Sequence, residues 1–183
     1  MSIIVMLIQK PKQVSFASGQ QKPAGYMVTD TDEIEFVRTL MKTVLCSDRD
    51  WVLSEEAYLL YAPCMYQPAY DDFKIQMEGF LNDPSVRIFV CENQGEKAGM
   101  MILKYSNAVA EIIGIAVPEK LHCRGIGRNM IQFVLKSENL ERLEAQTDDD
   151  SVGFYRKCGF AVERIVVDYP DGSVVRYNCV LNK

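Results

Sequence analysis

The chain has 183 residues, of which 48% are hydrophobic, 25% charged and 10% aromatic, a mixture typical of a folded globular domain rather than a disordered or fibrous protein. A chain of this length buries enough apolar surface to fold as one unit. Its 20 basic and 25 acidic residues give a net charge of -5, which disfavours a nucleic-acid partner because such partners select positively charged surfaces.

The beginning of the chain predicts one strand and a connection. Residues 3–8 are apolar and form the predicted strand, but Gln9, Lys10 and Pro11 end this run too early for a secretory signal, and no basic segment precedes it. Residues 13–25 are mostly small or polar and predict a flexible connection. Because no later stretch approaches the roughly 20 apolar residues that cross a bilayer, we expect a cytoplasmic protein without a membrane partner.

Helices are predicted next. Apolar residues recur at helical spacing over residues 34–45 and predict an amphipathic helix. Its apolar positions are Ile34, Val37, Leu40, Met41, Val44 and Leu45. Aromatic residues and methionine then cluster over residues 51–70, where Pro63 and Pro68 prevent one long helix. Helical spacing resumes over residues 73–81.

Three strands are predicted over residues 87–91, 98–105 and 108–117, where the helical spacing gives way to short apolar runs between turn-forming residues. The turns fall at residues 93–95 and 106–107. Because both turns are short, we expect the three strands to form an antiparallel meander.

The remainder of the chain predicts a crossover and a hairpin. An apolar helical stripe over residues 127–135 precedes a short strand over residues 143–147, and a strand, a helix and a strand in succession imply a parallel pair with a right-handed crossover. Residues 151–157 predict a short helix, and residues 160–167 with 174–181 a closing hairpin. The predicted fold class is α/β, with a mixed, mostly antiparallel central sheet flanked by helices.

Histidine and cysteine usage argues against a bound metal. His122 is the only histidine, which excludes any site that needs two imidazoles from one chain. The cysteines are scattered without a C-x-x-C pair, which indicates free thiols rather than a zinc site or a disulfide framework. They are Cys46, Cys64, Cys91, Cys123, Cys158 and Cys179. The acidic run over residues 148–150 is better explained as a helix cap than as a metal site.

The stretch from Gly114 to Arg128 carries the clearest chemical signal, a buried strand followed by a turn and a glycine-containing helix start. Backbone N–H groups at a helix N-terminus are unpaired and carry partial positive charge, so they bind phosphate oxygens. Gly125 and Gly127 permit close approach of a ligand, and Arg124 and Arg128 would add charge-assisted contacts.

Two familiar phosphate loops do not fit this stretch. A dinucleotide-binding fingerprint requires a third glycine where Met130 stands, and a P-loop requires G-K-[ST], which is absent. A tight turn whose glycine lets the helix pack on the sheet is the alternative interpretation of the stretch taken alone.

Three segments share the pattern of one family: the strand over residues 110–117, the loop His122-Cys-Arg-Gly-Ile-Gly127, and the segment Phe154-Tyr-Arg-Lys-Cys-Gly-Phe160. With the order of the elements, they resemble the GNAT family, the Gcn5-related N-acetyltransferases, over roughly residues 70–181. The resemblance implies one GNAT acetyltransferase domain over residues 1–183, with a variable acceptor-side region at 1–83 and an acetyl-CoA-binding core at 84–183.

The resemblance further implies an acetyl-CoA site where the strand at 110–117 splays from the strand ending near Thr147. Pantetheine amides would pair with main-chain groups of the first strand, and the pyrophosphate would lie on loop amides. The implied coenzyme-binding residues are Ile115, Ala116, Val117, His122, Cys123, Arg124, Gly125, Ile126, Gly127, Arg128 and Lys157. His122 stands where the family usually has Gln or Arg, and Asp148 where it often has Asn, but neither departure removes a main-chain donor.

Two residues are candidates for catalysis, because acetyl transfer needs an unprotonated amine and a proton for the departing thiolate. Glu111 is the only charged side chain over residues 108–117 and matches a glutamate that serves as base in one branch of the family; a carboxylate that faces solvent or pairs with a lysine is the alternative. Tyr155 matches the family tyrosine that protonates the coenzyme sulfur; a core aromatic beside Phe154 is the alternative. We expect His122 to cap or pack within its loop.

The function implied by the resemblance is acetyl-CoA-dependent N-acetylation, by direct attack, of a primary amine on a small molecule or a protein. A noncatalytic acetyl-CoA-binding sensor is the main alternative, and a nucleotide-binding protein is a third. The aromatic cluster over residues 51–70 suits either the wall of an acceptor pocket or the core. A homodimer is compatible with these features.

Overall fold

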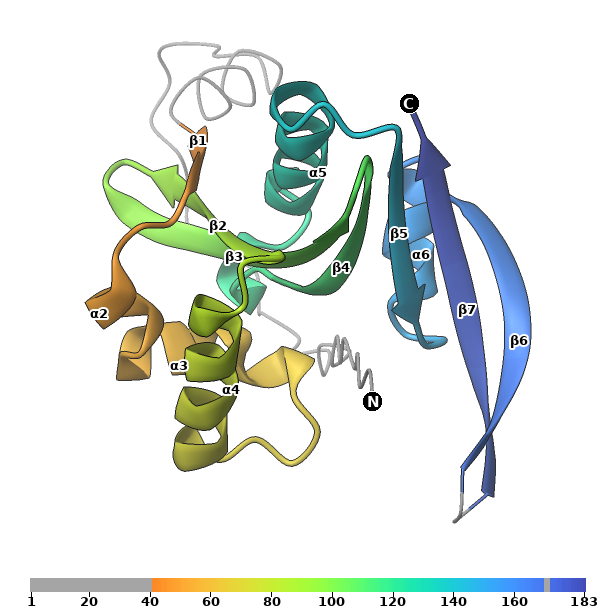
Figure 1. Cartoon of the computed structure of the whole chain (residues 1–183), viewed down its shortest axis with the longest axis horizontal. Helices are drawn as coiled ribbons and strands as arrows, with labels where there is room; N and C mark the ends of the chain where they lie inside the picture. The colour runs from red at the N-terminus through yellow and green to blue at the C-terminus, as the bar shows by residue number, and fades with distance from the viewer. Residues whose placement is uncertain (1–40, 170–171) are drawn as a thin grey trace, which may run out of the picture.

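The computed structural model describes residues 41–169 and 172–183, which form a seven-stranded sheet with helices on both faces (Figure 1). The strands are β1 (Met41–Leu45), β2 (Val86–Asn93), β3 (Glu96–Ser106), β4 (Val109–Ala116), β5 (Arg142–Thr147), β6 (Ala161–Tyr169) and β7 (Gly172–Asn182). Their order in the sheet is β1-β2-β3-β4-β5-β7-β6, and only β4 and β5 pair in parallel. The predicted mixed, mostly antiparallel sheet is therefore confirmed.

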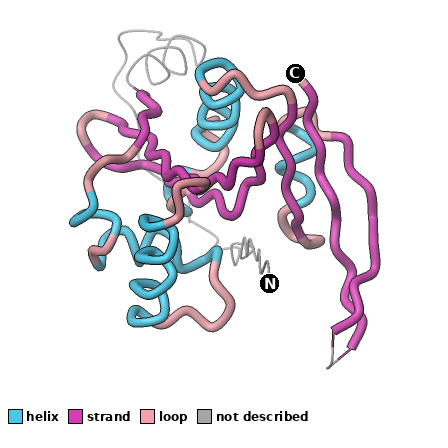
Figure 2. The backbone as a smooth tube through the Cα atoms, viewed as in Figure 1, coloured by secondary structure: helices cyan, strands magenta, loops and turns pink. Residues whose placement is uncertain are grey.

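Helices cover both faces of the sheet (Figure 2). One face carries α2 (Arg49–Val52), α3 (Glu55–Tyr61), the 3-10 helix η1 (Ala62–Cys64) and α4 (Tyr70–Asn82). The other carries α5 (Ile126–Ser137), which follows the 3-10 helix η2 (Glu119–Leu121), and α6 (Val152–Lys157). The Asp48 and Ser54 side chains cap α2 and α3 by accepting hydrogen bonds from first-turn backbone amides.

Each face of the sheet has its own hydrophobic core. The α5–α6 core includes Phe89, Met101, Leu103, Ala110, Ile112, Ile115, Met130, Val134 and Tyr155. The α3–α4 core includes Trp51, Tyr61, Cys64, Phe73, Met77, Met100, Ile102 and Ala116. Because strands contribute alternate residues to the two cores, the sheet separates them wherever its ladder is continuous.

β4 is irregular on both of its edges: it has a β-bulge against β3, and its pairing with β5 stops before either strand ends. Ile102 on β3 pairs with Gly114 and the next residue, Leu103, pairs with Ile112, so Ile113 is the extra residue of a β-bulge. Pairing between β4 and β5 ends at Ile112 and Ala145, although both strands continue. We call this place the fork: residues 113–116 form its β4 arm and residues 146–147 its β5 arm, and the two arms diverge in Figure 1.

One predicted helix is wrong in the part that the structure describes. Residues 41–45 form β1, which pairs antiparallel with β2 from Met41 opposite Asn93 to Leu45 opposite Phe89. The apolar residues Met41, Val44 and Leu45 suit the spacing of a helix, but pairing with β2 makes this segment a strand. The predicted strand at 3–8, the connection at 13–25 and the rest of the predicted helix lie outside the described residues.

Two further observations concern the cysteines and the helices. All six cysteines lie within the described residues and are free thiols, as predicted. Among the described helices, none combines the length and the apolar character that crossing a membrane requires.

Candidate active site

The loop between β4 and α5 presents unpaired backbone amides. Gly125, the N-cap residue that precedes α5, has the left-handed conformation, with φ of 82°, which glycine adopts without steric cost. The first hydrogen bond of the helix joins the Asn129 amide to the Gly125 carbonyl at 2.9 Å, and the amides of residues 126–128 donate to no group in the described part of the chain. A left-handed residue followed by helical ones directs successive amides to one side, an arrangement that binds anions.

Two side chains of this region hold the loop in place. His122 Nε2 donates to the Val117 carbonyl oxygen at 2.8 Å, so the imidazole packs within its own loop, as expected. The Arg128 guanidinium donates to the Lys157 carbonyl at the end of α6. Cys123 and Arg124 are exposed. The loop is therefore fixed to β4 at one end and to α6 at the other.

Gly127 sets the distance between α5 and α6. A Cβ atom added to Gly127 would lie 2.9 Å from Cε2 and Cζ of Phe154, closer than such atoms approach in proteins. Gly127 is thus required for the packing of α5 against α6, and it also permits a ligand to approach the loop. The two interpretations of this stretch, tight packing and a phosphate loop, are therefore compatible.

Tyr155 lies in the α5–α6 core with 1% of its surface exposed. Its ring packs edge-on against Phe154 and Phe160, with 5.2 Å between ring centroids in each pair. Burial raises the pKa of the phenol well above its ordinary value, and the nearby Cys64 thiol adds to this effect. The side chain therefore keeps its proton throughout the neutral pH range.

Tyr61 and Cys64 reach the fork from the opposite face of the sheet. A Cβ atom added to Gly114 would lie 2.7 Å from Cε2 of Tyr61 and closer still to its hydroxyl oxygen. Cys64 Sγ donates to the Ile115 carbonyl oxygen at 3.5 Å, and burial raises the pKa of its thiol to about 12. Burial raises the pKa of Tyr61 as well, with added contributions from Cys64 and Tyr155. Tyr61 and Cys64 therefore both contact the β4 arm.

Thr147, at the end of the β5 arm, is fully buried. Its hydroxyl oxygen has no hydrogen-bond partner among the described residues. An unpaired buried polar group costs about 1–3 kcal/mol, and native proteins retain such groups mostly where a water or a ligand meets them. The β5 arm of the fork thus offers a hydrogen-bonding group that the protein itself does not use.

Glu111 lies in the closed part of the ladder, before the fork. It sits opposite Lys104 on β3 and Glu144 on β5. Its neighbours Ala110 and Ile112 belong to the α5–α6 core, so its half-buried side chain faces the α3–α4 side. Among the described residues Glu111 makes no ion pair, which argues against the alternative that it is paired with a lysine.

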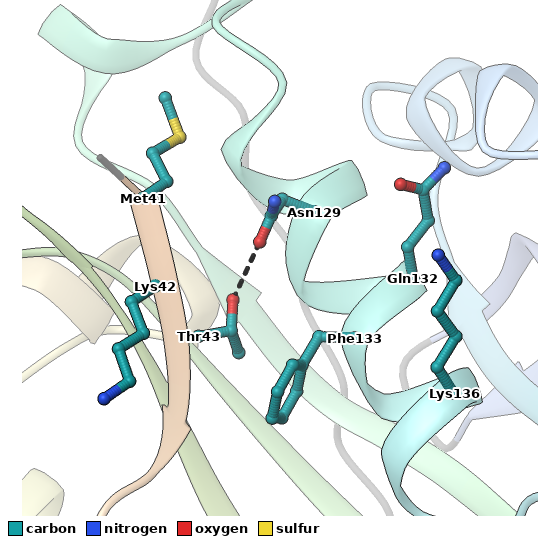
Figure 3. Close-up of a pocket in the computed structure, with 7 residues that line it drawn as sticks. All are labelled: Met41, Lys42, Thr43, Asn129, Gln132, Phe133 and Lys136. Carbon is teal, nitrogen blue, oxygen red and sulfur yellow. Dashed lines mark hydrogen bonds between the residues drawn. The ribbon is translucent and has the colours of Figure 1, made fainter. Parts of the chain in front are cut away.

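A separate hollow of about 350 Å³ lies between β1 and α5 (Figure 3). Thr43 Oγ1 donates to Asn129 Oδ1 across it at 3.0 Å. Its described lining is Met41, Lys42, Thr43, Asn129, Gln132, Phe133 and Lys136. None of these is a predicted site residue, and the predicted residues gather instead along β4, its following loop and α6.

The model of the acetyltransferase (GNAT) family matches residues 54–160 of the chain. The chain belongs to this family. Its fold is similar to that of the spermidine/spermine N-acetyltransferase SpeG from Vibrio cholerae, with a TM-score of 0.60 at 18% identity, covering 80% of this chain and 94% of that one. A comparison with curated protein sequences found no match.

Two further GNAT-fold structures are similar. The ribosomal-protein-S18-alanine N-acetyltransferase from Escherichia coli has a TM-score of 0.57 at 16% identity, covering 78% of this chain and 93% of that one. The IAA acetyltransferase from Bacillus cereus has a TM-score of 0.53 at 17% identity, covering 78% and 99%. At this level of identity the likeness shows a shared fold.

Asp148, where the GNAT pattern often has asparagine, holds the turn that precedes α6. Its Oδ1 accepts from the Ser151 amide at 3.0 Å, and its carbonyl accepts from the Val152 amide. The N-cap residue of α6 is Ser151, so the Asp148 carboxylate bonds one residue before the helix and not a first-turn amide as a cap would. Asp149 accepts a hydrogen bond from the Tyr177 hydroxyl at 2.6 Å.

Replacing Thr147 with valine, which has the same shape without the hydroxyl, should raise the free energy of unfolding by about 1 kcal/mol. The reason is that the ligand-free protein no longer buries an unpaired polar atom. Urea unfolding measures the change, and Thr43→Val is the matched control, because its hydroxyl is bonded to Asn129 and its loss should destabilise. A destabilised Thr147→Val protein would mean that the Thr147 hydroxyl has a partner.

Proposed function

We propose that the protein is an N-acetyltransferase that transfers the acetyl group of acetyl-CoA to a primary amine. The fork carries this proposal: β4 loses its β5 partner after Ile112, the free amides of residues 126–128 lie beyond the end of the β4 arm, and Tyr155 belongs to the same core as Ile115. Membership of the GNAT family supports it. Bound acetyl-CoA would supply an activated thioester.

The residues present fit this coenzyme. The amides of residues 126–128 suit pyrophosphate oxygens, because they are unpaired and lie at the positive end of α5. The main chain of residues 115–117 lies beyond the last β4–β5 pair, and the Thr147 hydroxyl faces no described partner. Both suit the amide groups of a pantetheine arm, which can add to a strand edge as another strand would.

The proposed chemical roles follow from the two faces of the sheet. Tyr155, buried and protonated on the α5–α6 side, can donate its proton to the departing sulfur. Glu111 faces the α3–α4 side and can accept the proton of an attacking amine, directly or through water. We therefore place the acceptor on the α3–α4 side, where Tyr58 and Tyr70 are partly exposed. The amine and the sulfur then lie on opposite sides of the acyl carbon.

Calorimetry with acetyl-CoA, followed by an acetylation screen, tests the proposal. The screen should include spermidine, an alanine-terminated peptide and a lysine peptide, since structural neighbours act on spermidine or a ribosomal-protein alanine. Released coenzyme A is read as free thiol, and samples without amine correct for the protein's six cysteines. Turnover of one amine supports the proposal. Binding without turnover on any amine would favour a sensor, and tighter binding of ATP than of coenzyme A would favour a nucleotide-binding protein.

Replacing Glu111 with glutamine should lower kcat/KM at neutral pH by about 100-fold, because a carboxamide cannot accept the amine proton. The pH profile of kcat/KM should also differ from that of the wild type, because in the variant only the loss of the amine proton would make the activity rise with pH. Glu144→Gln is the matched control, being the cross-strand neighbour of Glu111 on β5. An unaltered pH profile with full activity would show that Glu111 is not the base.

A further inference from the structure

Tyr61 and Cys64 lie against the β4 arm of the fork from the α3–α4 side of the sheet. The Tyr61 ring and hydroxyl lie at Gly114, and Cys64 Sγ donates to the Ile115 carbonyl oxygen at 3.5 Å. Both contacts fall beyond Ile112 and Ala145, where pairing between β4 and β5 ends. Tyr155 belongs to the core on the opposite face, together with Ile115.

The position of these side chains along β4 can be compared with that of a bound donor. The phosphate-binding amides lie at residues 126–128, so a pantetheine arm that pairs with residues 115–117 runs back along β4. A strand advances about 3.3 Å per residue, which places the thioester sulfur near Gly114. The Tyr61 ring lies against Gly114, and the Cys64 thiol lies on the carbonyl of Ile115.

The side chains at that level are enclosed. Tyr61 and Cys64 are 2% and 8% exposed. Beyond Gly114 the ladder between β4 and β5 is intact at Ile112 and Ala145. An acyl chain that extends from the sulfur would therefore meet Tyr61 and Cys64, and each added methylene would have to displace one of them.

We infer that Tyr61 and Cys64 determine acyl-group specificity: they form the end wall of the acyl site and restrict the donor to acetyl or a group of similar size. This inference rests on the proposed function and adds to it the residues that select the acyl group of the donor. Tyr61 limits the site through its ring and hydroxyl at Gly114, and Cys64 limits it through its sulfur beside Ile115. Neither residue transfers a proton in this role.

Isothermal calorimetry with coenzyme A and its acetyl, propionyl and butyryl thioesters tests the inference without an acceptor. Butyryl-CoA should bind about 10- to 200-fold more weakly than acetyl-CoA, the range for mismatch in a closed apolar pocket. Cys64→Ala removes one atom of the wall. The ratio of the Kd for propionyl-CoA to the Kd for acetyl-CoA should then fall about tenfold. Tyr61→Phe, which keeps the ring and removes the hydroxyl, should also lower this ratio.

Two variants serve as controls. Cys64→Ser keeps the size of the side chain and should keep the wild-type ratios of the affinities. Cys91→Ala removes another buried thiol, from β2 outside the fork, and should also keep them. Equal binding of acetyl-CoA and butyryl-CoA by the wild type, or unchanged ratios in both Cys64→Ala and Tyr61→Phe, would overturn the inference alone. Failure of coenzyme A and all its thioesters to bind would overturn the proposed function as well.

Discussion

Replacing Tyr155 with phenylalanine should lower kcat by about 100-fold and change the Kd for acetyl-CoA by no more than about threefold. A positioned general acid contributes about 10²–10⁴ to a rate, and burial keeps this phenol protonated. Phenylalanine keeps the ring that packs against Phe154 and Phe160. Single-turnover kinetics and calorimetry measure the two quantities separately.

Tyr177→Phe is the matched control for this change. Tyr177 is also buried and lies on β7 opposite Thr147, but its hydroxyl already donates a hydrogen bond to Asp149 at 2.6 Å. Its kcat should stay close to that of the wild type. If Tyr155→Phe turns over at the wild-type rate while chemistry limits turnover, Tyr155 is a core aromatic and not the acid.

Replacing Gly114 with alanine should lower the free energy of unfolding by about 3 kcal/mol. The new Cβ would overlap the buried ring of Tyr61, at 2.7 and 2.8 Å from Cε2 and Cζ, and forcing an extra carbon into a packed core costs about 1–3 kcal/mol. Tyr61 cannot move aside easily, because it is fully enclosed in the α3–α4 core. Urea unfolding with an unchanged m-value measures the effect.

In the same experiment, Gly79→Ala should raise the free energy of unfolding instead of lowering it. Gly79 lies on α4 with no atom within 4 Å of the position of an added Cβ, so alanine should stabilise the helix by about 0.5–1 kcal/mol. Combining Gly114→Ala with Tyr61→Phe should recover part of the loss, since the hydroxyl is the atom closest to the new carbon. A Gly114→Ala protein as stable as the wild type would show that Tyr61 does not press on β4.

The central strands and α5 were predictable because their signals are local. The turn at residues 93–95 and the turn at Asn107 bound β2, β3 and β4, and the stripe from Gly127 to Leu135 repeats with the period of a helix. The strand β1 was missed because its apolar residues continue the helical spacing of residues 34–40. Its pairing with β2 is a long-range interaction that local spacing does not contain.

The loop and α6 of the candidate site were predictable from their resemblance to a family pattern, but the side chains that close the fork were not. Nothing near Cys64 indicates that its thiol reaches Ile115, because this contact joins residues 51 positions apart. Tyr61 belongs to an aromatic cluster that suits a core equally well. One signal was available, since an isolated glycine inside an apolar strand suggests a bulge or a close approach, and Gly114 marks both.

The bulge at Ile113 lets β4 take in an extra residue while its later side chains stay on the layers that the earlier ones set. Before it, Ala110 and Ile112 point to the α5 layer; after it, Ile115 does so, an interval of three residues instead of two. Removing Ile113 would restore the interval of two, with Ile115 still facing the α5 layer and Ala116 the α3 layer. A one-residue deletion would therefore remove the bulge without inverting the end of β4, and the packing of the two layers alone does not preserve it.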